Sequence, residues 1–274
     1  MKDILNEEGL YELNMVEGDH GWMQDENVHF VEDKLGRKMW YRLDFAKKDH
    51  QTAPTMLVLH GVGHVSRPSL YAEKHWNTIK PLDQFGFENK GAWWLGENSD
   101  PFVMNLLDKV VSEATQKLEL ETDADLFIYG SSMGGYGALL HGARLGAKAV
   151  YANVPQVQLL GSKYSNNGMK KHFEVILSET GPLSKMNDLS VFLADTDLEH
   201  PLYFICENRF GTSENYLHEH ALKLVDMFIT KDINFHFEII PTRGHNKNRG
   251  IREVRALFEL YCIGDVDENH IGLN

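Results

Sequence analysis

The stretch Asp125-Leu-Phe-Ile-Tyr-Gly-Ser-Ser-Met-Gly-Gly-Tyr-Gly-Ala-Leu-Leu140 decides the fold of this chain. Its first part, 125–129, is a short, mostly apolar and β-rich run, and the part after Gly134 is typical of a helix. Between them lies a G-x-S-x-G sequence with Ser132 at its centre, the pattern of a sharp strand-to-helix turn that exposes a nucleophile. The glycines leave room for such a turn. The stretch predicts that Ser132, rather than its neighbour Ser131, is the nucleophile.

Short apolar runs alternate with helical stretches along most of the chain. This alternation predicts an α/β fold whose mostly parallel sheet has helices on both faces. Two alternating runs at the start predict an antiparallel hairpin, which would make the sheet mixed. The hairpin strands are expected at 28–32 and 38–45, the buried strands at 54–60, 125–129, 147–153, 202–206 and 235–240, and the helices at 102–118, 133–145, 215–229 and 251–261.

Two segments, 66–98 and 155–200, fit this alternation poorly. In α/β sheets such excursions usually leave from the carboxyl ends of strands, where ligands bind. We expect them to form loops or a small cap over a site. No stretch reads as a linker or a repeat, so a single domain over residues 1–274 is the simplest organisation.

The composition excludes some classes of binding partner and indicates the cellular compartment. A net charge of −13 argues against a nucleic-acid or anionic-membrane partner, because such surfaces require a concentrated basic face. No apolar run approaches the ~18 residues of a membrane span. Cys206 and Cys262 each lie in an apolar stretch and predict buried thiols in a reducing compartment. The N-terminal sequence lacks signal-peptide features, so we expect a cytoplasmic protein.

A serine hydroxyl needs a base, usually a histidine that is held by a carboxylate. His245 follows the last expected strand and an expected turn at 241–244, which is where the base of such a fold belongs. The acid should follow the strand at 202–206, and no aspartate occurs there. Glu207 is the preferred acid and Glu214 the alternative, although an acidic residue at a helix start is favourable without catalysis. A pair without an acid, oriented by Asn208 or a backbone carbonyl, stays open.

Backbone N–H groups must stabilise the negative charge that forms on the substrate oxygen. Met133 would provide one such donor because it begins the helix after Ser132. The second is expected from the early loop His60-Gly-Val-Gly-His64, in which Gly61 or Val62 could turn an N–H toward the site.

The motifs Leu59-His-Gly61, Tyr129-Gly-Ser-Ser-Met-Gly-Gly135 and Arg243-Gly-His245 together resemble the α/β-hydrolase superfamily over residues 28–261. The resemblance implies a sheet of about eight strands, a Ser132/His245 pair with an acid between them, and no metal or organic cofactor. The stretch from Gly130 to Leu139, followed by Lys148-Ala-Val-Tyr-Ala-Asn-Val-Pro-Gln156, also resembles hydrolase-fold proteins of capsule or surface-glycan modification and accessory secretion.

These patterns favour a serine hydrolase that cleaves a carboxylic ester or related acyl bond of a small-molecule or glycan substrate. An acyltransferase would use the same residues, with a sugar hydroxyl in place of water. A hydrolase-fold protein with a vestigial site, acting in glycan modification or secretion, is the alternative from another class. The sequence sets no oligomeric state.

Overall fold

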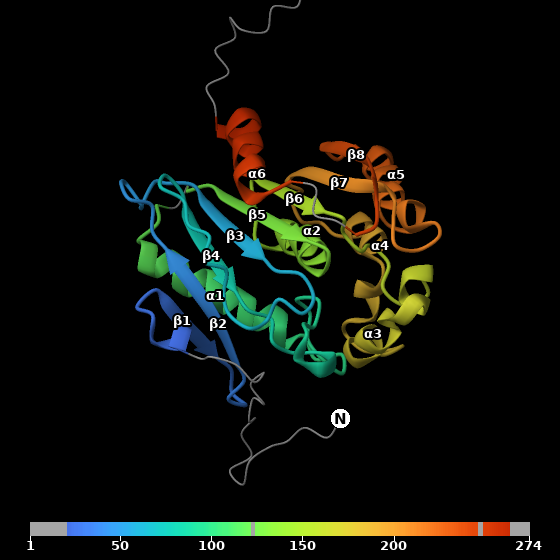
Figure 1. The fold of residues 1–274 in the computed structure, drawn as a ribbon, viewed down its shortest axis with the longest axis horizontal. Coiled ribbons are helices and arrows are strands. Elements are labelled where there is room, and N and C mark those ends of the chain that lie inside the picture. Colours follow the sequence, from blue (N-terminus) through green and yellow to red (C-terminus); the bar gives the residue numbers. More distant parts are fainter. Residues whose placement is uncertain (1–20, 122–123, 246–248, 264–274) are drawn as a thin grey trace, which may run out of the picture.

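The computed structural model describes residues 21–121, 124–245 and 249–263. Their centre is an eight-stranded sheet in the order β1-β2-β4-β3-β5-β6-β7-β8 (Figure 1). Strand β2 is antiparallel to both of its neighbours, β1 and β4, and all other neighbouring strands are parallel. The strands are β1 (Val28–Glu32), β2 (Lys38–Asp44), β3 (Thr55–Leu59), β4 (Asn77–Pro81), β5 (Leu126–Ser131), β6 (Ala149–Asn153), β7 (Leu202–Phe210) and β8 (Phe235–Arg243).

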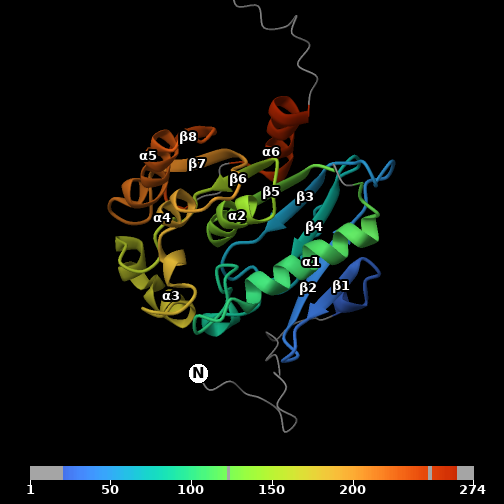
Figure 2. The same cartoon turned by 180° about the vertical axis from the view of Figure 1, so that it is seen from behind.

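Helices cover both faces of this sheet, as the alternation predicts. The larger core takes buried side chains from α1, α2 and α5, and the smaller core on the other face takes them from α6. In Figure 2, α1 runs across β1, β2 and β4. The α-helices are α1 (Phe102–Leu118), α2 (Met133–Arg144), α3 (Lys170–Ile176), α4 (Leu189–Ala194), α5 (Lys223–Thr230) and α6 (Ile251–Phe258). Short 3-10 or π segments are η1 (Gly21–Gln24), η2 (Phe87–Asn89), η3 (Ser165–Met169), η4 (Ser184–Asn187), η5 (His218–Leu222) and η6 (Glu259–Ile263).

Strand β4 lies inside 66–98, so the expectation of a loop or cap over all of this segment is wrong. Every residue of β4 is buried, although three of its five side chains are polar. The amide of Asn77 donates to the carbonyl of His50 at 2.8 Å, and the ammonium of Lys80 bonds to the carboxylate of Asp44. Satisfied polar groups can be buried at little cost, and their polarity conceals the strand in the sequence.

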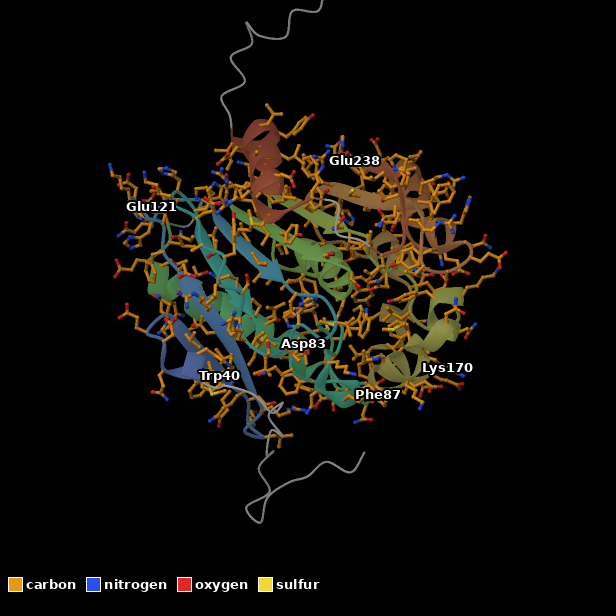
Figure 3. The ribbon with its side chains drawn as sticks, in the orientation of Figure 1. Trp40, Asp83, Phe87, Glu121, Lys170 and Glu238 are labelled. Atoms are coloured by element: carbon orange, nitrogen blue, oxygen red, sulfur yellow. The ribbon has the colours of Figure 1, made fainter. Side chains whose placement is uncertain are left out.

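The rest of this segment also joins the core. Trp93 and Trp94 are fully buried and have the left-handed φ values of 52° and 60°. One carboxylate oxygen of Asp83 accepts the N–H groups of Ala92 at 2.8 Å and Trp94 at 2.9 Å, which holds the turn. Figure 3 shows Asp83 toward the middle of the molecule, with Glu121 and Lys170 at its periphery.

Strands β7 and β8 run further than expected, and the turn expected at 241–244 is strand as far as Arg243. Glu207 pairs with Ile239 and Asn208 with Ile240. Pro241 fits because β8 is an edge strand, where a missing N–H costs no ladder bond. Glu207 therefore lies within β7 and not on a loop after it.

The structure also bears on the two cysteines and on the lengths of the helices. Cys206 is buried as expected, whereas the expectation that Cys262 is buried is wrong, because its side chain is half-buried; neither forms a disulfide. Within the described ranges, the helices are all too short or too polar to cross a bilayer.

Candidate active site

The G-x-S-x-G sequence forms the strained turn that it predicts. Ser132 has φ 57° and ψ −121°, and its N–H donates to the carbonyl of Asn153 at 2.9 Å. A Cβ on Gly130 would lie 1.9 Å from the carbonyl oxygen of Gly134, and one on Gly134 would lie 2.1 Å from that of Leu59. Only glycine fits at either position, and the crossing of β5 and α2 forces Ser132 into its unusual conformation.

The structure brings His245 to Ser132. Nε2 of His245 lies 2.7 Å from Oγ of Ser132, across 113 residues of sequence. Burial lowers the pKa of His245 to about 4, so the imidazole is neutral near pH 7 and Nε2 can accept the serine proton. This geometry is that of a hydroxyl next to its general base.

Two tyrosines enclose the imidazole. The ring of Tyr164 stacks on His245 with centroids 5.9 Å apart, and Tyr216 meets it edge-on at 5.5 Å. Asn208 holds the chain just before His245, because its amide donates to the carbonyl of Gly244 at 3.2 Å. The ring is therefore positioned by packing and by its own loop. Tyr164 and Tyr216 carry no motif that could have identified them in the sequence.

Glu207, the preferred acid, is fully buried at the carboxyl end of the sheet. Its Oε1 accepts the N–H of Asn208 at 2.8 Å. Within the described residues, its Oε2 and the Nδ1 of His245 have no hydrogen-bond partner, so the two side chains are not bonded to each other. Burial raises the pKa of Glu207 to about 8, which leaves the carboxyl protonated at neutral pH. Burial raises the pKa of the Tyr216 phenol, and the charge of an ionised Glu207 raises that pKa further.

Glu214, the alternative acid, lies on the surface. Its side chain is 79% exposed and forms an ion pair with Lys163 at 2.8 Å. That hydrogen bond lowers the pKa of Glu214. The structure therefore places Glu214 in a surface ion pair.

The early loop reaches the serine. Gly61 and Val62 line the same cavity as Ser132, and a Cβ on Gly61 would lie 3.8 Å from Cβ of Ser132. Met133 is the first residue of α2, where an N–H has no acceptor within the helix. The three residues named as oxyanion donors thus lie around Ser132.

His60 fixes the shape of this loop. The N–H of Asp83 donates to its Nε2 at 2.8 Å, so Nδ1 carries the proton and donates to the carbonyl of Gly61 at 2.8 Å. Burial lowers the pKa of His60 to about 4, which keeps the ring neutral. His60 is a structural residue that orients the peptide after Gly61.

Gln156, the last residue of the stretch 148–156, is a polar residue of the site for which the motifs predicted no role. It is fully buried, and its Nε2 lies 3.3 Å from Oγ of Ser132, 2.9 Å from the hydroxyl of Tyr216 and 3.4 Å from Nε2 of His245. Its Oε1 accepts the indole N–H of Trp93 at 3.1 Å. The only sequence signal for Gln156 was its position shortly after β6. This strand lies next to β5, and Ser132 follows the end of β5.

A cavity of about 640 Å³ opens on Ser132 and His245. Its walls come from the ends of β3 and β5 and from the irregular segment between β3 and β4. The residues that line it are Val58, His60, Gly61, Val62, His64, Ser66, Arg67, Pro68, Ser69, Leu70, Lys80, Pro81, Leu82, Tyr129, Ser131, Ser132, His245 and Ile251. This volume suits a small-molecule substrate or one end of a larger one.

Comparison with known proteins gives structural likenesses only. No protein-family model matches the chain, and no curated protein matches it in sequence. An S-formylglutathione hydrolase from Agrobacterium tumefaciens is similar at a TM-score of 0.62 and 14% identity, over 80% of this chain and 87% of that one. FphF, a fluorophosphonate-binding serine hydrolase of Staphylococcus aureus, is similar at 0.61 and 16%, over 85% and 96%.

A third similar structure is the capsule O-acetyltransferase of Neisseria meningitidis serogroup A, with a TM-score of 0.57 and 18% identity over 81% of this chain and 90% of that one. These likenesses agree with the strand order and with the turn at Ser132. The chain has the α/β-hydrolase fold.

Proposed function

We propose that this protein is a serine hydrolase that cleaves a carboxylic ester or related acyl bond of a small-molecule or glycan substrate. The observation that carries the proposal is the 2.7 Å contact between Ser132 Oγ and His245 Nε2 at a strained strand-to-helix turn. Oγ attacks the carbonyl carbon while Nε2 takes its proton, and the alcohol leaves with that proton. Water then attacks the acyl-enzyme by the same route in reverse.

The negative charge on the substrate oxygen would be stabilised by backbone donors. The N–H of Met133 and that of Gly61 or Val62 are the proposed pair, since all three residues lie around Ser132. Such donors, fixed before the reaction, cost no reorganisation when the charge develops. The His60 bond to the Gly61 carbonyl supports this fixed geometry.

We propose Glu207 as the acid of the pair, ahead of Glu214. Glu207 is buried and, in addition to burial, its charge raises the pKa of Tyr216, which contacts His245, whereas Glu214 is a surface residue. When His245 takes the serine proton, Nδ1 would donate to Oε2 of Glu207. The positive charge of the ring would lower the pKa of this carboxyl, which would release its own proton to water and become the carboxylate partner. Catalytic hydrogen bonds that are open in a resting enzyme often close with substrate bound.

Acyl transfer to a sugar hydroxyl is the second candidate, favoured by the likeness to a capsule O-acetyltransferase. The serine and the base would act in the same way, and the fate of the acyl-enzyme decides between the two activities. No residue described above separates them.

Turnover of p-nitrophenyl acetate by the parent, Ser132→Ala and His245→Ala tests the proposal. Release of nitrophenol should require both residues. Addition of methyl glucoside then divides the two activities, because an acyltransferase yields the acetylated sugar while a hydrolase yields only acetate. Release by the parent that persists in Ser132→Ala would overturn the proposal.

A further inference from the structure

The cavity beside Ser132 carries a charge of opposite sign to that of the whole protein. The chain has a net charge of −13, yet no aspartate or glutamate is among the described residues that line the cavity. The basic side chains that line it are Arg67 and Lys80, with His64 beside them. Local charge, more than net charge, selects a small ligand at close range.

Of these side chains, Arg67 is the one that can bind a ligand. The ammonium of Lys80 is already occupied by the carboxylate of Asp44, the carbonyl of Tyr71 at 2.6 Å and the hydroxyl of Thr78 at 2.8 Å. Arg67 has no ion pair or ring contact among the described residues. Every other arginine of the chain is paired with an acid or lies over an aromatic ring.

The segment that carries Arg67 is fixed at both ends. The amide of Gln84 donates to the carbonyl of Val65 at 2.8 Å, and Lys80 donates to the carbonyl of Tyr71. Pro68, between these two points, is buried. The backbone that bears Arg67 is therefore a wall of the cavity that is anchored on each side.

We propose that Arg67 binds an anionic group of the substrate, a carboxylate or a phosphate, in the cavity next to Ser132. This inference rests on the proposed function, since the anion must belong to an ester that reaches Ser132. A guanidinium can make two parallel hydrogen bonds to either group. Leu70, on the same segment and 58% exposed, would contact the apolar part of such a substrate.

Matched esters test the proposal. On the acyl side, p-nitrophenyl hydrogen succinate is compared with its neutral isostere p-nitrophenyl 4-methylpentanoate; on the alcohol side, 3-carboxyphenyl acetate is compared with 3-carbamoylphenyl acetate. In at least one pair, Arg67→Gln should lower the anionic-to-neutral ratio of kcat/KM by about three- to tenfold, the range of a partly exposed charge pair. Arg252→Gln removes the same charge from a side chain outside the cavity and should leave both ratios unchanged.

The outcomes separate the two proposals. Ser132-dependent turnover with both ratios unchanged in Arg67→Gln overturns the anion site and leaves the hydrolase intact. Turnover of no ester at all, in a folded protein, overturns both.

A second inference rests on a different observation, the buried chain of hydrogen bonds behind Ser132. The indole N–H of Trp93 can only donate, so it fixes the carbonyl end of the Gln156 amide toward itself. The NH₂ end must then face Ser132, His245 and Tyr216. The Tyr216 hydroxyl accepts from it and donates to the carbonyl of Val154 at 3.3 Å.

We infer that Gln156 is a catalytic residue that donates a hydrogen bond to Oγ of Ser132 as this oxygen becomes negative. The contact is long in the resting state, at 3.3 Å, and charge on the oxygen would shorten it. The same positive end of the amide lies 3.4 Å from Nε2 of His245, where it disfavours an imidazolium. Gln156 thus acts on both partners of the proton transfer.

Gln156→Met keeps the size of the side chain and removes its donors. We expect kcat to fall by about tenfold with KM nearly unchanged, and the acid limb of the pH profile to move to higher pH because the imidazolium is no longer opposed. Gln158→Met, at a neighbouring half-buried position, should alter neither quantity.

If Gln156→Met does not fold, Trp93→Phe provides the second test. It keeps a buried ring but frees the amide to rotate, and it should lower kcat by a smaller factor in the same direction. Folded variants whose kcat and acid limb both match those of the parent would overturn the inference.

Discussion

Nε2 of His245 lies 2.7 Å from Oγ of Ser132, while Nδ1 of the same ring has no hydrogen-bond partner among the described residues. The proposed base is therefore in contact with the proposed nucleophile without a bonded acid to orient it. Its orientation comes from the rings of Tyr164 and Tyr216 and from the bond between Asn208 and Gly244.

The acid limb of kcat/KM should lie at unusually low pH. Burial lowers the pKa of His245 to about 4, so the neutral base persists well below the usual histidine value of 6.5. Activity should be lost as the pH falls through about 4, because protonation removes the acceptor for the serine proton. The acid limb can be measured from kcat/KM for nitrophenol release at a series of pH values between 3.5 and 8, with each reaction stopped by acid. An apparent pKa at or above 6.5 would contradict the burial of this ring.

Replacing Glu207 by Gln should lower kcat by at least about tenfold, since an amide cannot become the carboxylate that stabilises an imidazolium. Glu214→Gln should leave kcat unchanged because that side chain is exposed and paired with Lys163. Steady-state turnover of one ester by the two variants shows which of the two glutamates acts as the acid. Full activity in Glu207→Gln would mean that Ser132 and His245 work without this acid.

Glu207→Gln should also be more stable than the parent at alkaline pH. The folded Glu207 carboxyl keeps its proton up to about pH 8, whereas the unfolded chain releases it near 4.5. The free energy gained from the buried neutral acid is thus present below pH 4.5 and is lost as the pH rises to 8. Thermal unfolding at pH 5 and pH 8 should show an advantage for Glu207→Gln that grows with pH. An advantage that does not change with pH would place the carboxyl in a different environment.

Substitution of Tyr164 by Leu should lower kcat by about three- to tenfold with little effect on KM, because the ring stacked at 5.9 Å can stabilise the transient imidazolium. Tyr261→Leu, which changes a 57% exposed ring on η6, is the matched control. Equal kcat values in the two variants would assign Tyr164 a packing role only.

Gly134→Ala should destabilise the fold by about 2 kcal/mol or more, because its Cβ would lie 2.1 Å from the carbonyl oxygen of Leu59. Gly250→Ala is the control, since the nearest atom to its Cβ would be 3.5 Å away. Urea unfolding compares the two. If the midpoints coincide, the contact between β3 and α2 is looser than described.

The fold and the strained turn at Ser132 were predictable from the sequence because their determinants are local. The strand-to-helix turn needs small residues at fixed offsets from the central serine, and Gly130 and Gly134 occupy these positions. The assignment of His245 as the base was a prediction from its position after the last expected strand. Strand β4 was not predictable, because Asn77 and Lys80 read as surface residues until their partners His50 and Asp44 are in place.

The residues that surround Ser132 and His245 could not be predicted from the sequence for a similar reason. Gln156, Tyr164 and Tyr216 come from irregular or helical segments that only the tertiary structure brings to Ser132 and His245. No spacing rule connects such residues. The pKa of Glu207 depends on its burial within β7, which required the extension of β7 and β8 beyond the strands expected from apolar runs.

The central claim is that Ser132 is an activated nucleophile, and mass spectrometry after treatment with a fluorophosphonate tests it most directly. We predict one adduct per chain on the native protein, located on Ser132, absent in Ser132→Ala and strongly slowed in His245→Ala. Ser131→Ala should still carry the adduct. A native, folded parent that takes up no probe, or an adduct that remains in Ser132→Ala, would contradict the account.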